Sequence, residues 1–193
     1  MQPEPVRRIA LLGGESSGKT TLARLLATQL GTAWVPEYGR QRWEEQRETL
    51  SVDELLHVAR TQVAWEDEHA ALAQVQACGW LVCDTTPLTT LQYCLFDHGQ
   101  APAELQGLAR RHYDPTLLCL PDFTFVQDGC RRDDHFRTRQ HDWTLARLAA
   151  MGVTPWLVSG TVQARLSQVV QRLALERQQP DAKPARPGKV SPR

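Results

Sequence analysis

The sequence predicts an α/β fold in which one five-stranded parallel sheet lies between two layers of helices. Short apolar runs, each bounded by Gly, Pro, Asp or Ser, alternate with longer segments of helical periodicity. This alternation is typical of consecutive βαβ units. A glycine-rich segment follows the first apolar run and leads directly into a helical pattern. The length of 193 residues suits one domain with a substantial core, so we expect a three-layer arrangement around a single sheet.

The predicted strands are short and apolar throughout, as expected for strands buried on both faces of a parallel sheet. They fall at residues 8–12, 32–35, 80–83, 116–120 and 154–158. A long helix is expected between the second and third strands. It begins at a predicted capping box formed by Ser51 and Glu54, and apolar residues recur at helical spacing as far as Ala70. A final amphipathic helix is expected over residues 162–177.

Residues 1–177 are expected to form one folded domain and residues 178–193 a disordered tail. The tail is basic and contains prolines at positions 180, 184, 187 and 192. It has too little apolar surface to offset the entropy lost on folding. A simple solvated chain end is the favoured interpretation, and a contact with RNA or an acidic partner is the alternative.

The bulk composition is that of an ordinary globular protein, with 41% hydrophobic and 23% charged residues. The formal net charge is zero, so no nucleic-acid partner is expected. The apolar runs are too short to cross a bilayer, and the first residues do not resemble a secretory signal. The five cysteines form no C-x-x-C pair. We therefore expect a reduced cytoplasmic protein that does not associate with membranes.

The glycine-rich segment at residues 13–20 reads Gly-Gly-Glu-Ser-Ser-Gly-Lys-Thr and matches the pattern G-x-x-x-x-G-K-T. In this motif backbone N–H groups surround nucleotide phosphates, the lysine reaches the β- and γ-phosphates, and the threonine hydroxyl binds Mg²⁺. The alternative is a chance match in a Gly/Ser-rich turn. The motif predicts a P-loop nucleoside triphosphate hydrolase or kinase fold. The expected nucleotide-binding residues are Gly13, Gly14, Glu15, Ser16, Ser17, Gly18, Lys19, Thr20 and Thr21.

Acidic residues follow two further strands of the predicted sheet. Ligands of parallel α/β sheets bind beyond the carboxyl ends of the strands. Asp84 ends the third apolar run and is expected to hold Mg²⁺, directly or through water; the alternative is an N-cap for the next helix. Glu37 follows the second strand and is expected to accept the proton of a substrate hydroxyl or to bind a ribose. Its alternative is a favourable charge in the first turn of a helix.

Arginines near this edge of the sheet add positive charge. Arg40 lies one helical turn after Glu37, where it can orient Glu37, contact phosphate or form a surface ion pair. Residues 128–141 follow the fourth strand and include four arginines within nine positions. Arginine binds phosphate with two parallel hydrogen bonds and stays charged. We expect a lid that closes over the triphosphate; the alternative is a solvated face with internal Asp–Arg pairs.

Four of these segments together resemble the ribosylnicotinamide kinase domain of NadR-type proteins. They are residues 13–20, the Glu37-Tyr38-Gly39-Arg40 segment, residues 84–90 and residues 128–131. The resemblance covers residues 7–175. It implies transfer of the γ-phosphate of ATP to the 5′-hydroxyl of nicotinamide riboside, which gives nicotinamide mononucleotide. The helix-turn-helix and the H-x-G-H motif of longer NadR proteins have no counterpart in this sequence, so regulator and adenylyltransferase activities are not expected.

The resemblance also implies roles for individual residues. Catalytic roles fall on Lys19, Glu37, Asp84 and Arg131. Thr20 and Asp84 would bind Mg²⁺, and the lid arginines Arg131 and Arg139 would bind ATP. The substrate contacts would be Glu37, Tyr38, Arg40 and Thr86. The third-strand motif reads Asp-Thr-Thr, whereas many relatives are expected to have Asp-Thr-Asp, so a nucleoside contact at Thr86 departs from the family pattern.

Two other functions are compatible with the same phosphate-binding residues. One is a kinase for another nucleoside or small metabolite, because the phosphate loop does not select the acceptor. The other is a regulatory switch that binds ATP and reports its presence to a partner. A switch does not need an acid that faces a substrate hydroxyl, so Glu37 favours the kinase.

Overall fold

The computed structural model describes residues 5–76, 78–123 and 133–178. Five strands form one sheet in the order β2-β3-β1-β4-β5, and every neighbouring pair is parallel. The strands are β1 (Arg7–Leu12), β2 (Trp34–Val35), β3 (Trp80–Asp84), β4 (Thr116–Cys119) and β5 (Trp156–Val158). The predicted five-stranded parallel sheet is therefore confirmed.

The two outer strands are shorter than expected from the sequence. β2 begins at Trp34 because the backbone N–H of Thr32 bonds to Ala27 O at 3.0 Å and closes the preceding helix instead. β5 begins at Trp156, immediately after Pro155. Proline has no backbone N–H to donate, so Pro155 cannot add a hydrogen bond to the pairing of β5 with β4.

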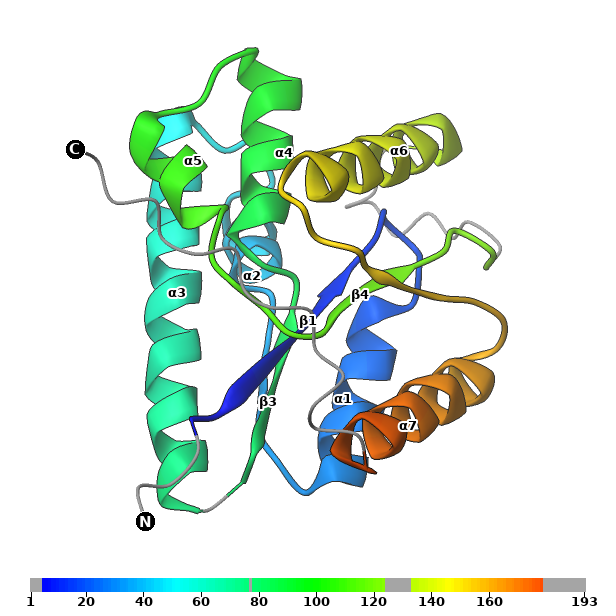
Figure 1. The fold of residues 1–193 in the computed structure, drawn as a ribbon. Helices are drawn as coiled ribbons and strands as arrows, with labels where there is room; N and C mark the ends of the chain where they lie inside the picture. The colour runs from blue at the N-terminus through cyan, green and yellow to red at the C-terminus, as the bar shows by residue number, and fades with distance from the viewer. Residues whose placement is uncertain (1–4, 77, 124–132, 179–193) are drawn as a thin grey trace, which may run out of the picture.

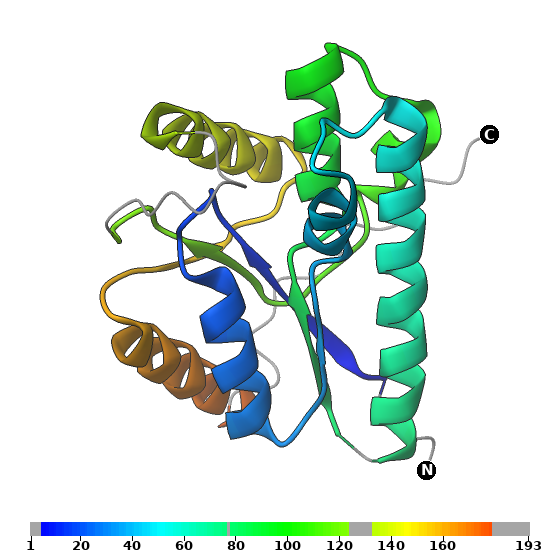
Figure 2. The same ribbon diagram turned by 180° about the vertical axis from the view of Figure 1, so that it is seen from behind.

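Helices cover both faces of the sheet (Figures 1 and 2). On one face α1 (Lys19–Leu30) packs beside α7 (Val162–Gln178). The other face is covered by α3 (Val52–Val75), α4 (Pro87–His98) and α5 (Ala103–Leu108), which contact one another. The short helix α2 (Tyr38–Gln46) contacts α3, and α6 (Asp134–Ala150) contacts α4. The arrangement is the predicted three-layer one.

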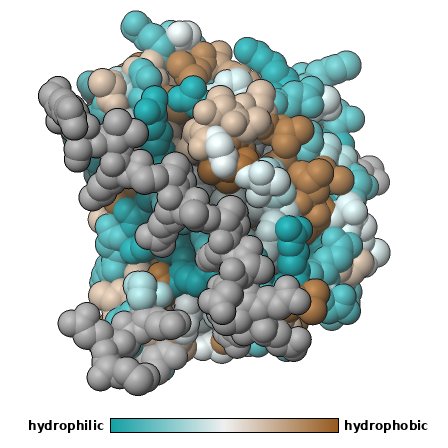
Figure 3. Space-filling view, in the orientation of Figure 1, coloured by the Kyte–Doolittle hydropathy of each residue, from teal (hydrophilic) through white to brown (hydrophobic). Residues whose placement is uncertain are grey.

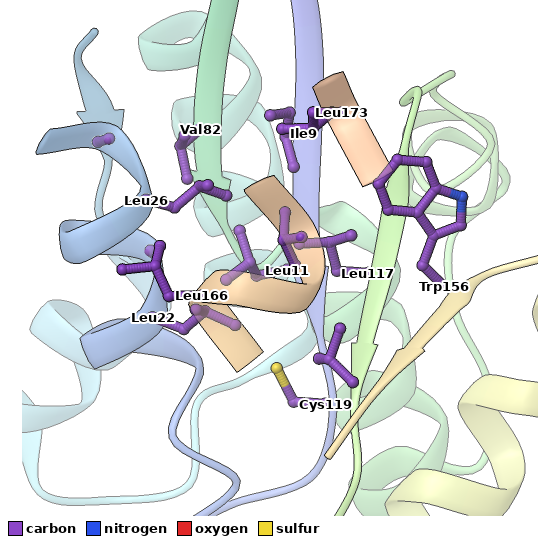
Figure 4. Packing of buried hydrophobic residues seen from close by; sticks show 14 of the residues in the cluster. Ile9, Leu11, Leu22, Leu26, Val82, Leu117, Cys119, Trp156, Leu166 and Leu173 are labelled. Atoms are coloured by element: carbon purple, nitrogen blue, oxygen red, sulfur yellow. The ribbon is translucent and has the colours of Figure 1, made fainter. Parts of the chain in front are cut away.

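The core is divided by the sheet, because side chains alternate between its faces. Ile9 and Leu11 of β1 pack with Leu22 and Leu26 of α1 and with Leu166 of α7 (Figure 4). On the opposite face Leu12 and Leu118 pack with residues of α3, α4, α5 and α6. Because both faces are buried, the strands show the continuous apolar runs seen in the sequence.

The sequence also predicts where α3 begins and where α7 lies. Ser51 Oγ accepts a hydrogen bond from Glu54 N at 3.3 Å, and the Glu54 carboxylate accepts one from Ser51 N at 2.9 Å. This confirms the capping box at the start of α3, a feature that stabilises a helix by about 1 kcal/mol. The final helix extends over Val162–Gln178, one residue beyond the prediction. The remainder of the predicted tail lies outside the described residues.

The surface has hydrophobic groups set among hydrophilic ones on the face shown in Figure 3. The exposed large hydrophobic side chains within the described ranges are Leu25, Leu72, Val75, Leu145, Leu157 and Leu175. They belong to several different elements. In the described part of the chain, no helix combines the length and apolar character needed to cross a membrane.

Candidate active site

A cavity of about 860 Å³ lies beside the phosphate loop at the carboxyl ends of β1, β2 and β3. Its walls are formed by the loop at residues 13–20, by Glu37 after β2 and by Asp84 at the end of β3. Residues from α2, α3 and α4 complete it. Cavities of this size are typical of small-molecule sites, and their position at the strand ends is the usual one in parallel α/β proteins.

The glycines of the phosphate loop allow three other segments to pack closely against it. A Cβ atom at Gly13 would lie 2.6 Å from Cys119 O, and one at Gly14 would lie 2.7 Å from Arg137 O. At Gly18 the Cβ would lie 2.7 Å from the Phe123 ring. Gly13 and Gly18 also have positive φ values, 143° and 76°. Side chains at these positions would therefore displace β4, α6 or Phe123.

Lys19 begins α1 with its ammonium turned toward the phosphate loop. Lys19 Nζ donates to Gly14 O at 2.8 Å and lies 3.5 Å from Ser17 Oγ. No side chain caps the helix at Gly18, so the first N–H groups of α1 are available to an anion. Thr20 and Thr21 also line the cavity. The loop therefore combines an ammonium, open backbone donors and hydroxyls on one wall.

Asp84 is 1% exposed and ends β3 at the cavity. Burial raises its pKa, and the nearby Thr20 hydroxyl and Lys19 ammonium lower it. Although Thr20 is close, no hydrogen bond of good geometry reaches either carboxylate oxygen from the described residues. The N-cap alternative is wrong, because Thr86 caps α4 by accepting a hydrogen bond from Leu88 N at 3.2 Å. Asp84 thus places two buried oxygens at the cavity wall.

Glu37 has a pKa raised to about 7, first because its carboxyl group is shielded from solvent and second because Asp84 adds a nearby negative charge. Glu15 raises it further, whereas Lys19 and Arg40 lower it. Glu37 precedes α2, but its side chain makes no capping hydrogen bond. The carboxyl group can therefore gain or lose a proton near neutral pH, as a general base must.

Comparison with known proteins places the chain in a family. The model of the AAA domain family matches residues 8–165, which is most of the chain. The chain belongs to the AAA domain family. This AAA domain is 30% identical over 141 residues to the trifunctional NAD biosynthesis/regulator protein NadR of Salmonella typhimurium (strain LT2). The match includes 68% of this chain but only 32% of that protein, so the chain spans about a third of the relative's length.

Solved structures share the fold of this AAA domain. A NadR protein in complex with NR superposes with a TM-score of 0.67 at 19% identity, over 97% of this chain and 53% of that one. A thymidylate kinase from Ehrlichia chaffeensis superposes with a TM-score of 0.63 at 17% identity, over 88% of this chain and 100% of that one. These matches confirm the predicted P-loop kinase fold.

The cavity of the AAA domain brings most of the predicted site residues together. These are Gly13, Glu15, Ser16, Ser17, Gly18, Lys19, Thr20, Thr21, Glu37, Arg40 and Asp84. Gly14 supplies the carbonyl that Lys19 contacts. Arg40 also pairs with Glu44 through Nε at 3.0 Å, so the surface ion pair expected as one alternative is present.

Other predicted site residues lie elsewhere. The Tyr38 ring packs edge-on against Trp65, with ring centroids 5.0 Å apart, and is not part of the cavity wall. Thr86 caps α4 and lines a separate cavity of about 130 Å³. Arg139 lies 3.9 Å over the Phe96 ring, away from the main cavity. Arg131 falls outside the described residues.

The second half of the expected lid, residues 134–141, forms the first turns of α6. Two buried side chains of this part are well packed. Arg137 Nη1 donates to Phe123 O at 2.7 Å, and Gln140 Oε1 accepts from Glu15 N at 3.0 Å. This region of the AAA domain thus braces the phosphate loop. The first residues of the expected lid lie outside the described ranges.

Several residues at the site were missed from the sequence. Thr85 lines the cavity with φ 68°, a value that costs a non-glycine residue about 1 kcal/mol or more, and its N–H bonds to Leu11 O at 3.0 Å. Tyr93 OH donates to Glu15 Oε1 at 2.9 Å. Gln140 and Gln62 are polar residues on buried helix faces. A polar residue inside an apolar helical stripe was the available signal for both glutamines.

Behind the loop lies another residue that the sequence analysis missed. Arg165 of α7 is fully buried. Its guanidinium donates to Ser17 O at 2.7 Å, Gly160 O at 2.9 Å and Leu120 O at 3.0 Å, and it also pairs with Asp122. Arg165 therefore ties the phosphate loop of the AAA domain to the ends of β4 and β5.

Proposed function

We propose that the protein is a kinase that transfers the γ-phosphate of ATP to the 5′-hydroxyl of nicotinamide riboside, giving nicotinamide mononucleotide. The observation that carries this proposal is the meeting of Lys19, Glu37 and Asp84 in one cavity. At about 860 Å³, the cavity has room for an acceptor beside the phosphates. Similarity to NadR over 141 residues, and the fold match to a NadR protein in complex with NR, support nicotinamide riboside as the acceptor.

Mg²⁺ fits the residues at the end of β3. Both oxygens of Asp84 are buried without a partner among the described residues, and the Thr20 hydroxyl is nearby. Mg²⁺ prefers oxygen ligands and commonly binds through one or two protein groups, with waters and substrate phosphates completing its shell. Thr20 and Asp84 would therefore hold the ion. When bound, Mg²⁺ would neutralise charge on the β- and γ-phosphates.

The residues of the chain would act mainly by positioning and electrostatics. The Lys19 ammonium would exchange its contact with Gly14 O for phosphate oxygens, and N–H groups of the loop and of α1 would bind the others. Glu37 would accept the proton of the 5′-hydroxyl as that oxygen bonds to the γ-phosphorus. The bond from the γ-phosphorus to the bridging oxygen would break, and ADP would leave with its electron pair. The role of Arg131 and Arg139 as lid arginines stays a prediction.

The proposal is tested by incubating the protein with ATP, Mg²⁺ and nicotinamide riboside and separating the products by chromatography. We expect nicotinamide mononucleotide and ADP in equal amounts. Lys19→Ala should lower kcat/KM by about 100- to 1,000-fold, the usual loss for one electrostatic donor to a transition state. Arg172→Ala is the matched control. Arg172 is a residue of α7 that lies over the Trp156 ring of β5, and it is not part of the cavity wall.

Each component of the proposal can fail separately. If no mononucleotide forms under any condition, nicotinamide riboside is not the acceptor. If Lys19→Ala keeps full activity, the phosphate loop is not the active site. If ATP binds tightly but no small molecule stimulates its turnover, the protein is a regulatory switch.

A kinase for another nucleoside is the second candidate. It is favoured by the superposition on a deoxyadenosine kinase from M. mycoides, TM-score 0.55 at 11% identity over 87% of this chain and 99% of that one. The thymidylate kinase match, TM-score 0.63, shows that the same fold also serves an acceptor that is a nucleotide. The phosphate loop would act identically on either acceptor. An ADP-release assay with a panel of nucleosides distinguishes the candidates, because the true acceptor should have the highest kcat/KM.

A further inference from the structure

One face of α3 forms part of the cavity wall. Leu55, Val58 and Gln62 follow one another at helical spacing, and all three line the cavity. Leu55 and Val58 are apolar and nearly fully buried. Gln62 is only 2% exposed although its amide is polar. A buried amide is unfavourable unless its donors and acceptors are satisfied, so its presence on this wall requires an explanation.

The Gln62 amide is held in one orientation. Its Oε1 accepts a hydrogen bond from Tyr38 N at 3.0 Å, which identifies the other terminal atom as the Nε2 donor. The Tyr38 ring is itself packed against Trp65 and His57. At Gly39 a Cβ would lie 3.3 Å from Val58 Cγ1, so α2 is close to α3 at this point. The backbone donor that orients Gln62 is therefore fixed by packing.

The remaining donor of Gln62 is the Nε2 group. Nε2 is buried, and it has no hydrogen-bond partner among the described residues. The side chain lines the same cavity as Lys19 and Glu37. An oriented, buried donor on the wall of a cavity is matched by a ligand that presents an acceptor atom at that point.

We propose that Gln62 is a specificity-determining residue for the acceptor nucleoside, to which its Nε2 donates a hydrogen bond. This inference rests on the proposed function. The nucleoside would place an oxygen acceptor at Gln62, and Leu55 and Val58 would contact its apolar surface. In nicotinamide riboside the oxygen belongs either to the carboxamide or to the ribose. Acceptors without an oxygen at this point leave the buried donor unpaired and are rejected.

Gln62→Glu tests the role of the donor with little change of shape. The variant keeps an oxygen for Tyr38 N and replaces the Nε2 donor by a second oxygen. With ATP saturating, we expect kcat/KM for nicotinamide riboside to fall on the order of 10- to 100-fold. The KM for ATP should change little. Gln106→Glu, at an exposed site on α5 where Nε2 bonds to Ala101 O, is the matched control and should retain the wild-type values.

A second experiment identifies which oxygen of the acceptor receives the hydrogen bond from Gln62 Nε2. Pyridine riboside lacks the carboxamide but keeps the ribose hydroxyls. If Gln62→Glu no longer lowers kcat/KM with this analogue, Nε2 donates to the carboxamide. If the fold-change is the same with both acceptors, Nε2 donates to a ribose oxygen. The first result supports a direct contact, and the second supports one when the KM for ATP is unchanged; an equal loss together with a raised KM for ATP overturns it.

The outcomes separate this inference from the proposed function. Wild-type activity on nicotinamide riboside combined with an unchanged kcat/KM in Gln62→Glu overturns the role of Gln62 and leaves the function standing. If nicotinamide riboside is not phosphorylated, the same comparison is made by calorimetric binding of adenosine, thymidine and cytidine in the presence of ADP. Binding that weakens at least tenfold in Gln62→Glu supports the contact, and binding that is absent or unchanged overturns it.

Discussion

Glu37 and Glu66 are both acids with a pKa near 7, yet they face different surroundings. Glu66 is a fully buried residue of α3, and its carboxylate accepts a hydrogen bond from Tyr113 OH at 2.9 Å and lies 3.0 Å from Arg111 Nε. Glu37 lines the cavity with Asp84 and Lys19. A raised pKa therefore does not identify a catalytic acid by itself; access to the cavity distinguishes the two.

The proposed kinase activity should decline as pH falls below about 7. Burial and the Asp84 charge raise the pKa of Glu37 to about 7, against the opposing charges of Lys19 and Arg40. Below this pH Glu37 is protonated and cannot accept the proton of the acceptor hydroxyl. kcat/KM should then fall about tenfold per pH unit. A pH profile of kcat/KM measures this limb, and a flat profile between about pH 5 and pH 7 would contradict the role of Glu37.

Two variants show which acid causes the fall of kcat/KM below about pH 7. Glu37→Gln should remove most of the activity at every pH, because the amide cannot take up the proton. Glu66→Gln is the matched control: its acid has a similar pKa but lies outside the main cavity wall. The Glu66→Gln variant should still lose activity below about pH 7.

The phosphate loop is packed against several secondary-structure elements. β4 approaches Gly13, α6 approaches Gly14, and the Phe123 ring approaches Gly18, each within 3 Å of a would-be Cβ atom. Gln140 of α6 and Tyr93 of α4 also form hydrogen bonds with Glu15. The loop conformation is thus determined by elements far away in the sequence.

Gly14→Ala should destabilise the protein by about 1–3 kcal/mol, because the new methyl group would displace α6 at Arg137 O. Gly107→Ala is the matched control within α5, where a Cβ atom meets nothing within 4 Å. That substitution should stabilise the protein by about 0.5–1 kcal/mol through helix propensity. Chemical denaturation measures both changes. Equal effects of the two substitutions would show that α6 does not pack rigidly on the loop.

The elements that the sequence predicts are those encoded locally. The apolar runs, the phosphate motif and the Ser51–Glu54 capping box each depend on neighbouring residues, and all three are found in the structure. Asp84 and Glu37 were located because parallel strands bring their carboxyl ends to one edge. The predicted contact of Asp84 with Mg²⁺ stays a prediction.

The roles that the sequence does not reveal depend on distant partners. Tyr38 turns toward Trp65, which lies on a different helix, so its ring leaves the cavity. Gln62 interrupts the apolar face of α3, but the sequence does not show that its partner is Tyr38 N on another helix. Arg165 looks like an ordinary surface arginine of an amphipathic helix, because its partners belong to loops up to 148 residues away. Only tertiary packing distinguishes these side chains.

For the whole molecule, Arg165 joins parts that are far apart in the chain. Its guanidinium bonds to the phosphate loop, to the end of β4 and to the turn before α7. It also lies 4.4 Å over the Phe123 ring, which in turn packs on Gly18. Asp122 offsets its charge and accepts a hydrogen bond from Gly160 N at 2.6 Å.

Arg165→Met should lower the free energy of unfolding by about 3–5 kcal/mol, because three carbonyls and Asp122 would lose a buried partner. Arg172→Met is the matched control on the same helix. Arg172 contacts the Trp156 ring at 4.2 Å, an interaction that contributes about 0.5–1 kcal/mol. Urea denaturation of both variants gives the comparison. A loss at Arg165 no larger than that at Arg172 would contradict its linking role.

The connection between the neighbouring strands β2 and β3 has a consequence for how such proteins diverge. It carries α2 and α3, and with them Gln62 and the apolar wall of the cavity. The phosphate loop at residues 13–20 precedes it, and Asp84 ends β3 after it. One uninterrupted stretch of the chain therefore contributes much of the proposed acceptor pocket. Mutation, or exchange of that stretch between relatives, can alter the preferred acceptor while the inherited phosphate chemistry stays intact.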